Sequence, residues 1–167
     1  PWGIQNFLGV PCDIIRFDAN DGRTCIVLAS KSQKAALPKQ VTGIRISGRV
    51  RALYFFHTAA WVRRGEVALT YRIHYRSGRT LDVPAVIGTH IGNWWHPGGE
   101  LSRYVAFRNR FDRGFYCMEW ENPNPEDEVL SLDLVSPNSK VVPIVIGITA
   151  EELGARKLLS WSGLRGY

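Results

Sequence analysis

The sequence predicts an all-β protein with an antiparallel sandwich or barrel architecture. Apolar and polar residues alternate over short segments along most of the chain, and turn-forming residues separate these segments at fairly regular spacing. The 167 residues have the length of one domain, and 45% of them are hydrophobic. This apolar content excludes a disordered chain, and no apolar run reaches the roughly 18–20 residues of a membrane-spanning helix.

The expected strands follow one another along the chain. The clearest alternation is that of Val129–Val135, and the clearest hairpin joins Val67–Tyr75 to Thr80–Val86 through Ser77-Gly78. The run Leu53–Phe56 is apolar on both faces and therefore indicates a central strand. The remaining expected strands are Cys12–Phe17, Cys25–Leu28, Ile44–Val50, Tyr104–Phe107, Phe115–Trp120 and Val141–Ile148.

The end of the chain alone predicts a helix. Thr149 is a suitable N-cap, and Glu152 completes a capping box ahead of apolar residues. We therefore expect a β-sandwich domain over residues 1–149. A short helix and tail over 150–167 would form an appendage or a link to a further domain.

The charges are unevenly distributed. The chain carries 21 basic and 15 acidic residues, a net charge of +6, and most of the basic residues are arginines. Between Gly43 and Gly114 there are twelve arginines and four acidic residues, whereas residues 115–135 hold six acidic residues and no basic one. This pattern suits a polar or anionic ligand, since arginine binds carboxylate and sulfate groups in bidentate fashion, but a solvated dipolar surface is the favoured interpretation. Without a lysine-rich run or an RNA-binding aromatic motif, nucleic acid is disfavoured.

The three cysteines, Cys12, Cys25 and Cys117, have no metal-ligand or redox spacing. One bridge between Cys12 and Cys25 is compatible with the pattern, and so are buried free thiols. The chain opens at Pro1 without a signal peptide, which indicates a processed product or a piece of a longer chain.

One turn has the beginning of a calcium-loop pattern. Asp18, Asn20 and Gly22 are spaced as D-x-N-x-G, but the distal glutamate of an EF-hand is absent. A plain turn is the favoured interpretation, with Asp18 and Asn20 as a weak calcium candidate. Nucleophile-elbow, zinc-protease and P-loop motifs are also absent from the sequence.

The segment from Gly88 to Glu100 is the richest candidate site. It contains Asn93, Trp94, Trp95 and His96 within a loop between two strands. Tryptophan rings offer flat apolar faces to the C–H faces of sugars, while Asn and His supply hydrogen bonds to hydroxyl groups. The alternative interpretation is that both tryptophans close the open end of the sandwich.

Two further groups of residues are of types that can take part in binding or catalysis. His57 ends the central strand and is expected to be a hydrogen-bonded core residue, with Trp61 in the loop beyond it. Glu119 and Glu121 share one face of a strand and invite a glycosidase interpretation. However, a catalytic pair must flank the scissile bond, so the favoured interpretation is that both carboxylates face solvent or pair with a cross-strand arginine.

Taken together, several segments resemble the jelly-roll sandwich modules of the galactose-binding-like group, which are accessory carbohydrate-binding domains of secreted bacterial polysaccharide-degrading enzymes. The resemblance spans Gly9 to Thr149 as a pattern of strands and aromatics. It is carried by Val10-Pro11-Cys12-Asp13-Ile14, Leu53–Trp61, Tyr71-Arg72-Ile73-His74-Tyr75, Trp94-Trp95 and Glu119-Trp120-Glu121-Asn122-Pro123. It implies ligand binding by loops at one end of the sandwich, commonly a structural calcium, and an extracellular or periplasmic location.

We therefore expect a non-catalytic module that binds a polysaccharide, with an acidic polymer left open. Its other partners would be further domains of a larger chain, and we expect it to bind neither nucleic acid nor a membrane. It would need no cofactor apart from that calcium. The expected contacts are Trp61, Asn93, Trp94, Trp95, His96 and Arg103. Two alternatives remain: a structural or interdomain sandwich without a ligand, and a small jelly-roll polysaccharide lyase using Tyr, His and Arg.

Overall fold

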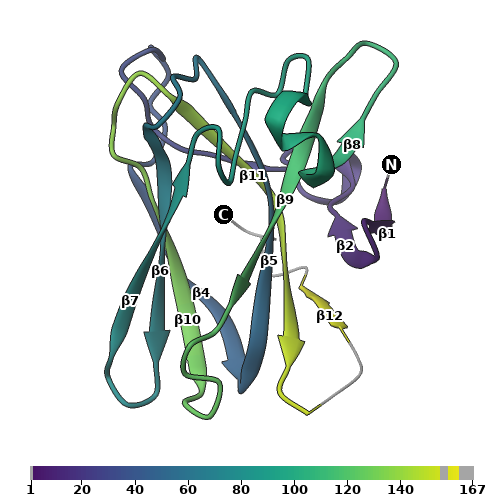
Figure 1. Ribbon diagram of the computed structural model, residues 1–167. Helices are drawn as coiled ribbons and strands as arrows, with labels where there is room; N and C mark the ends of the chain where they lie inside the picture. The colour runs from purple at the N-terminus through teal and green to yellow at the C-terminus, as the bar shows by residue number, and fades with distance from the viewer. Residues whose placement is uncertain (1, 155–157, 162–167) are drawn as a thin grey trace.

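The protein is built from antiparallel β-sheets packed face to face (Figure 1). The computed structural model describes residues 2–154 and the backbone of 158–161. The first sheet has the order β4 (Gln40–Gly48), β10 (Val129–Val135), β6 (Val67–Tyr75) and β7 (Thr80–Val86). The second has the order β12 (Leu158–Trp161), β11 (Val142–Glu152), β5 (Val50–Ala60), β9 (Gly114–Glu121) and β8 (Val105–Arg108), with β3 (Ile26–Val27) paired to β11. The predicted antiparallel sandwich is therefore confirmed, and it is compatible with a jelly roll.

The main core lies between the two sheets, and β5 runs through its centre. The Phe55 ring stacks on Tyr71 of the opposite sheet with centroids 3.8 Å apart. His57 is fully buried beside them: its Nδ1 accepts a hydrogen bond from the Tyr71 hydroxyl at 2.7 Å, and its Nε2 donates to the His90 carbonyl at 3.0 Å. Burial lowers the pKa of His57 to about 4, so its ring is neutral at pH 7. The expectation that His57 is a hydrogen-bonded core residue is confirmed.

A second, smaller core covers the outer face of the β5–β9 sheet. The hairpin of β1 (Gly3–Phe7) and β2 (Val10–Ile14) packs there, and the Phe7 ring meets Phe115 edge to face at 5.2 Å. Strand β1 was not expected from the sequence, and the β2 strand begins two residues earlier than predicted. The three cysteines are free: Cys12 and Cys117 are buried in this second core, so the Cys12–Cys25 bridge that the sequence left open does not form.

The C-terminal helix expected after Thr149 is not found in the described residues. Thr149 and Glu152 both lie in β11, and Leu158–Trp161 forms β12, which pairs with β11. Instead of capping a helix, the Thr149 hydroxyl donates to the Pro11 carbonyl at 2.5 Å. The β-branched run that leads into Thr149 and its pairing with β5 override the local capping signal. The boundary expected at 149/150 falls within β11, and residues 155–157 and 162–167 of the expected appendage lie outside the described residues.

The ends of the sandwich differ in their loops and in their charge. At the end drawn lowest in Figure 1, short turns join β4 to β5, β6 to β7, and β9 to β10. There the acidic segment neutralises basic residues from other strands, through the ion pairs Arg49–Glu126, Arg51–Glu119 and Arg76–Glu128. The opposite end, which we call the loop end, carries residues 61–66, 87–104 and 109–113. In the described part of the chain, no helix has the length and apolar character needed to cross a membrane.

Candidate binding site at the loop end

The tryptophan-containing segment 92–96 is fixed between two strands of the larger sheet. The Trp94 amide donates to the Ala59 carbonyl at 2.9 Å, and the Gly114 amide donates to the Trp94 carbonyl at 2.9 Å. The segment therefore continues the sheet between the end of β5 and the start of β9. Its side chains are therefore carried by backbone paired with the sheet, whereas the sequence predicts a loop here.

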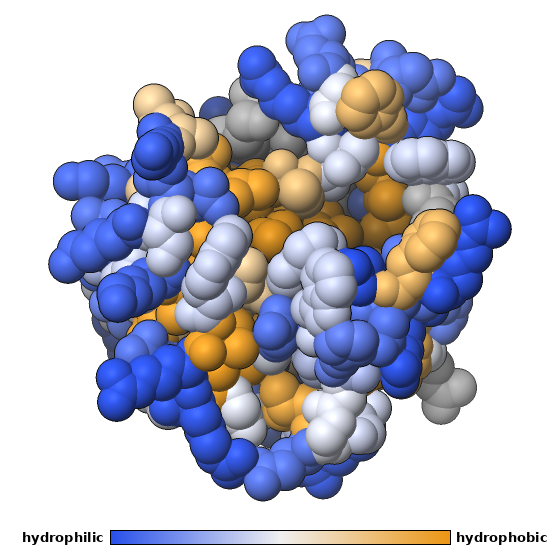
Figure 2. Space-filling view, turned by 90° about the horizontal axis from the view of Figure 1, so that it is seen from above, coloured by the Kyte–Doolittle hydropathy of each residue, from blue (hydrophilic) through white to orange (hydrophobic). Residues whose placement is uncertain are grey.

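Three tryptophan rings lie exposed at this end. Trp61, Trp94 and Trp95 are 60%, 37% and 42% exposed, respectively. Together with Ala60 and Asn93 they line a groove of about 350 Å³. The rings of Trp94 and Trp95 meet edge to face with centroids 5.6 Å apart, so they present differently oriented surfaces. Figure 2 looks onto this end and shows apolar side chains in a hollow surrounded by a hydrophilic rim.

Trp61 holds its position in an unfavourable backbone conformation. Its φ of 51° lies in the left-handed region, which a bulky side chain rarely adopts. The residue follows immediately after β5, where the chain turns away from the sheet. Such strain, when the surrounding structure enforces it, is found most often at functional positions.

His96 connects Trp95 to a charged pair behind it. The Trp95 indole N–H donates to His96 Nε2, and His96 Nδ1 donates to Asp112, which also pairs with Arg108. A neutral imidazole protonated on Nδ1 satisfies both contacts. The hydrogen bond from His96, together with the Arg108 guanidinium, lowers the pKa of the Asp112 carboxyl. Because both ring nitrogens are engaged, His96 orients the Trp95 ring.

Of the other residues expected at the site, one lines the groove and one does not. Asn93 lines it: its Oδ1 accepts from the Trp95 amide at 3.2 Å, and its side-chain NH₂ has no partner among the described residues. Arg103 lies on the 3-10 helix η2 (Gly99–Tyr104) with its guanidinium 4.6 Å from the Tyr104 ring centroid. It does not line the groove.

One residue of the site was missed by the sequence analysis. Arg113 packs its guanidinium over the Trp95 ring and 5.2 Å from the centroid of Trp94. A β-bridge joins Arg113 to Trp95, and Asn109 Oδ1 accepts from the Arg113 amide at 3.0 Å. The sequence predicts strands on either side of this loop, Tyr104–Phe107 and Phe115–Trp120, but it gives no sign that the loop between them meets the tryptophans.

The calcium-like turn uses its polar groups internally. Asp18, in the 3-10 turn η1 (Phe17–Ala19), binds the Arg16 guanidinium at 2.9 and 2.6 Å, and this hydrogen bonding lowers the pKa of the Asp18 carboxyl. The Asn20 side chain donates to the Arg23 carbonyl at 3.0 Å. Among the described residues, no cluster of three His, Cys, Asp or Glu side chains could hold a metal ion. The observed contacts are those of a plain turn.

The candidate catalytic groups lie apart from the groove. Glu119 and Glu121 both pair with Arg51, at 3.2 and 3.4 Å, so the expected cross-strand arginine is present. Tyr116 is buried, and its hydroxyl donates to the Asn93 carbonyl at 3.2 Å. His57 is likewise enclosed in the core.

Comparison with known proteins gives no relative: no protein-family profile, curated protein or solved structure matches this chain. The class of protein that the structure defines is therefore an antiparallel β-sandwich with an aromatic groove at its loop end.

Proposed function

We propose that this chain is a non-catalytic module that binds a polysaccharide across the groove formed by Trp61, Trp94 and Trp95. The observation that carries the proposal is the exposure of three indole rings along one groove, two of them on a segment that sheet hydrogen bonds hold in place. Isolated exposed apolar residues are common, but a group of large rings lining one groove marks an interaction surface.

The chemistry of the groove suits a sugar chain. Pyranose rings present flat patches of C–H groups, and these pack on the faces of tryptophan rings while the hydroxyl groups remain in water. The NH₂ group of Asn93, which has no partner among the described residues, is placed at the same groove to donate to a hydroxyl oxygen. Rings at different inclinations would contact successive sugar units of a twisted chain, which favours an oligomeric ligand over a single sugar.

The resemblance to accessory modules supports the same proposal. We infer that the chain operates as part of a larger secreted bacterial enzyme that degrades polysaccharides, in an extracellular or periplasmic location. Its role would then be to hold that enzyme on its polymer, and the bond cleavage would belong to another domain.

The proposal is tested by screening the protein on a glycan array and measuring the positive ligands by calorimetry. Stacking of a nucleobase on an aromatic ring contributes about 1–3 kcal/mol, and by analogy Trp95→Ala should weaken sugar binding by roughly 5- to 150-fold. Trp2→Ala is the matched control, since Trp2 is 59% exposed and lies outside the groove. Equal loss of affinity in both variants would contradict the proposal.

The two alternatives give different results in the same experiments. A structural sandwich would bind no glycan on the array. A lyase or hydrolase would release unsaturated uronides or new reducing ends from neutral, uronic or sulfated polymers during incubation. We expect binding and no product.

A further inference from the structure

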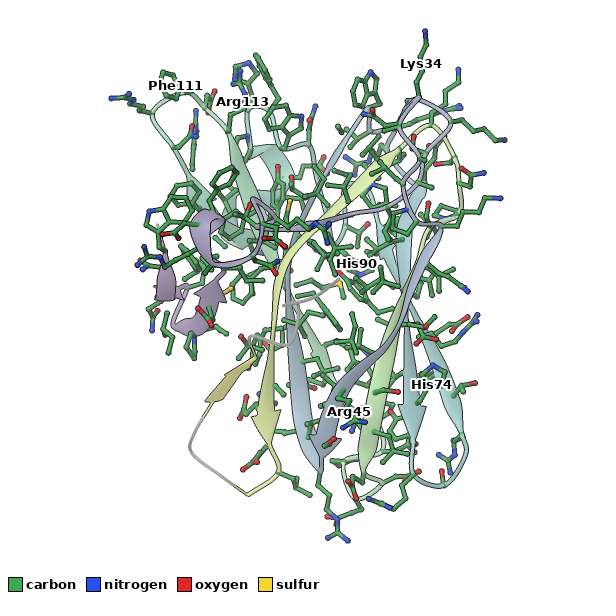
Figure 3. All side chains as sticks on the ribbon, turned by 180° about the vertical axis from the view of Figure 1, so that it is seen from behind. Lys34, Arg45, His74, His90, Phe111 and Arg113 are labelled. Carbon is green, nitrogen blue, oxygen red and sulfur yellow. The ribbon has the colours of Figure 1, made fainter. Side chains whose placement is uncertain are left out.

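The arginines of this chain fall into two groups by their surroundings. One group forms ion pairs with carboxylates, both along the strands and at the two ends of the sandwich, as in the bidentate contact of Arg72 with Asp82 at 2.8 and 2.9 Å. At the loop end Arg110 and Arg113 have no ion pair with any carboxylate of the described residues. Figure 3 shows Arg113 and Phe111 at the loop end, whereas Arg45, which also has no ion pair among the described residues, lies far along the strands near His74. Among the described arginines without an ion pair, Arg113 is the one whose guanidinium lies over the tryptophan rings.

Arg113 is held in one orientation while keeping part of its hydrogen-bonding capacity. Its Nη1 donates to the carbonyl oxygens of Phe111 and Asp112, and its guanidinium plane rests against Trp94 and Trp95. Its Nε and Nη2 groups have no partner in the part of the chain that the structure describes. These two N–H groups form one edge of the guanidinium fork, the arrangement that binds two oxygens of an anionic group.

Asp112 does not neutralise this arginine. Its carboxylate is bound by His96 on one oxygen and by Arg108 on the other. The negative charge nearest to Arg113 in sequence is therefore already matched by a different cation.

Arg113 also lies beside the proposed path of a sugar chain. A second hollow of about 220 Å³ opens on the outer face of the larger sheet, with Arg113 and Asn109 among its lining residues and Ile144 and Ile146 from β11. Trp94 lines both this hollow and the tryptophan groove, so the two adjoin across one ring. A ligand that stacks on Trp94 would bring its substituents within reach of Arg113.

We propose that the ligand is an acidic glycan, and that Arg113 binds its carboxylate or sulfate group in bidentate fashion while the neighbouring rings stack on the sugar. This inference rests on the proposed carbohydrate-binding function and adds the class of sugar. Stacking by the tryptophans supplies contacts common to many sugars, and Arg113 selects the charged ones.

The test compares polymers that differ in charge. Polygalacturonate carries carboxylates, and its fully methyl-esterified form carries none; κ-carrageenan carries sulfates, and agarose serves as its neutral counterpart. In calorimetry at low salt, we expect at least one anionic polymer to bind about ten- to a hundredfold more tightly than its neutral counterpart, as for a hydrogen bond to a charged group. The pair that shows this preference identifies the anionic group. The preference should weaken at physiological salt, where exposed charges are screened within about 8–10 Å.

Two variants separate bidentate binding from general attraction. Arg113→Gln should abolish the preference, and Arg113→Lys should lose most of it because lysine keeps the charge but not the fork. Arg110→Gln is the matched control: it removes the same charge from the same loop, from a side chain that packs over Phe111. It should retain most of the preference. Melting temperatures establish that each variant is folded, and the wild-type comparison needs no variant at all.

The outcomes distinguish this inference from the function on which it rests. Equal affinity for anionic and neutral members of both pairs overturns the acidic-glycan inference, and so does an equal effect of Arg110→Gln and Arg113→Gln. Either result leaves carbohydrate binding intact. Failure to bind any glycan on the array and all four polymers overturns both.

Discussion

The backbone conformation of Trp61 should reverse the usual order of stability between an alanine and a glycine substitution at that position. Alanine is ordinarily preferred over glycine by about 0.5–1 kcal/mol, because glycine loses more chain entropy on folding. At Trp61 the φ of 51° places the residue in the left-handed region, which costs an L-residue about 1–2 kcal/mol and costs glycine almost nothing. The structure therefore predicts that Trp61→Gly is more stable than Trp61→Ala, by about 0.5–1 kcal/mol.

Loss of the ring itself does not affect this comparison. Trp61 is 60% exposed, so its ring covers roughly 60–100 Å² of the 150–250 Å² that a buried aromatic side chain would cover. At about 25 cal/mol per Å², both variants lose the same 1.5–2.5 kcal/mol of burial. The difference between them then reports the backbone alone, and Trp61→Gly should stay folded while it loses affinity for the glycan.

Equilibrium urea unfolding of the two variants measures the difference. Trp94 provides the control position, because its φ is not positive and its amide and carbonyl are held in sheet hydrogen bonds. There Ala should be more stable than Gly. If Trp61→Ala proves as stable as Trp61→Gly or more so, the left-handed conformation is refuted, and with it the placement of the Trp61 ring in the groove.

Three further predictions concern the core. The buried ring of His57 should titrate with a pKa of about 4 in NMR, against 6.5 for an exposed histidine. Stability should therefore fall by about 3 kcal/mol between pH 6.5 and pH 4, since only the unfolded ring takes up a proton in that range; a native value near 6.5 would contradict the buried site. Gly92→Ala would bring a Cβ to 2.7 Å from the Tyr116 ring, so urea unfolding should show a loss of about 1–3 kcal/mol, and an unchanged midpoint would argue against this packing. Burial raises the pKa of both Cys12 and Cys117 to about 12, so a thiol reagent at pH 8 should label them only after unfolding, and rapid labelling of the native protein would disprove their enclosure.

The sequence predicted the strands correctly where each of them buries only one face, because apolar and polar residues then alternate. The alternation in Val129–Val135 and the hairpin around Ser77-Gly78 predicted strands that the structure confirms as β10, β6 and β7. The prediction was wrong where tertiary pairing decides the local conformation. The capping box at Thr149 is a valid local signal, yet the residue pairs with Tyr54 of β5 and therefore remains in a strand.

The site could be predicted only in part. Trp61, Asn93, Trp94 and Trp95 were identified from their residue types, and the structure brings all four to one groove. Arg113 could not be found in this way, because it reaches the groove from a separate loop through a non-local bridge.

The charge pattern is another feature that the sequence predicted only in part, because its ion pairs join residues far apart along the chain. Part of the basic excess between Gly43 and Gly114 is cancelled by the acidic segment at the short-turn end. The sequence contained both charges but not the pairing that leaves Arg113 without a carboxylate beside the tryptophans.

The six tryptophans provide the most direct test of the proposed binding groove. Each indole N–H gives one signal in a ¹H–¹⁵N NMR spectrum of the folded protein, and single substitutions assign these signals. On titration with a glycan that binds, we expect the signals of Trp61, Trp94 and Trp95 to shift while that of Trp2 stays in place. Shifts at Trp2 with none at these three, or binding that leaves all three unchanged, would contradict a binding site at the loop end.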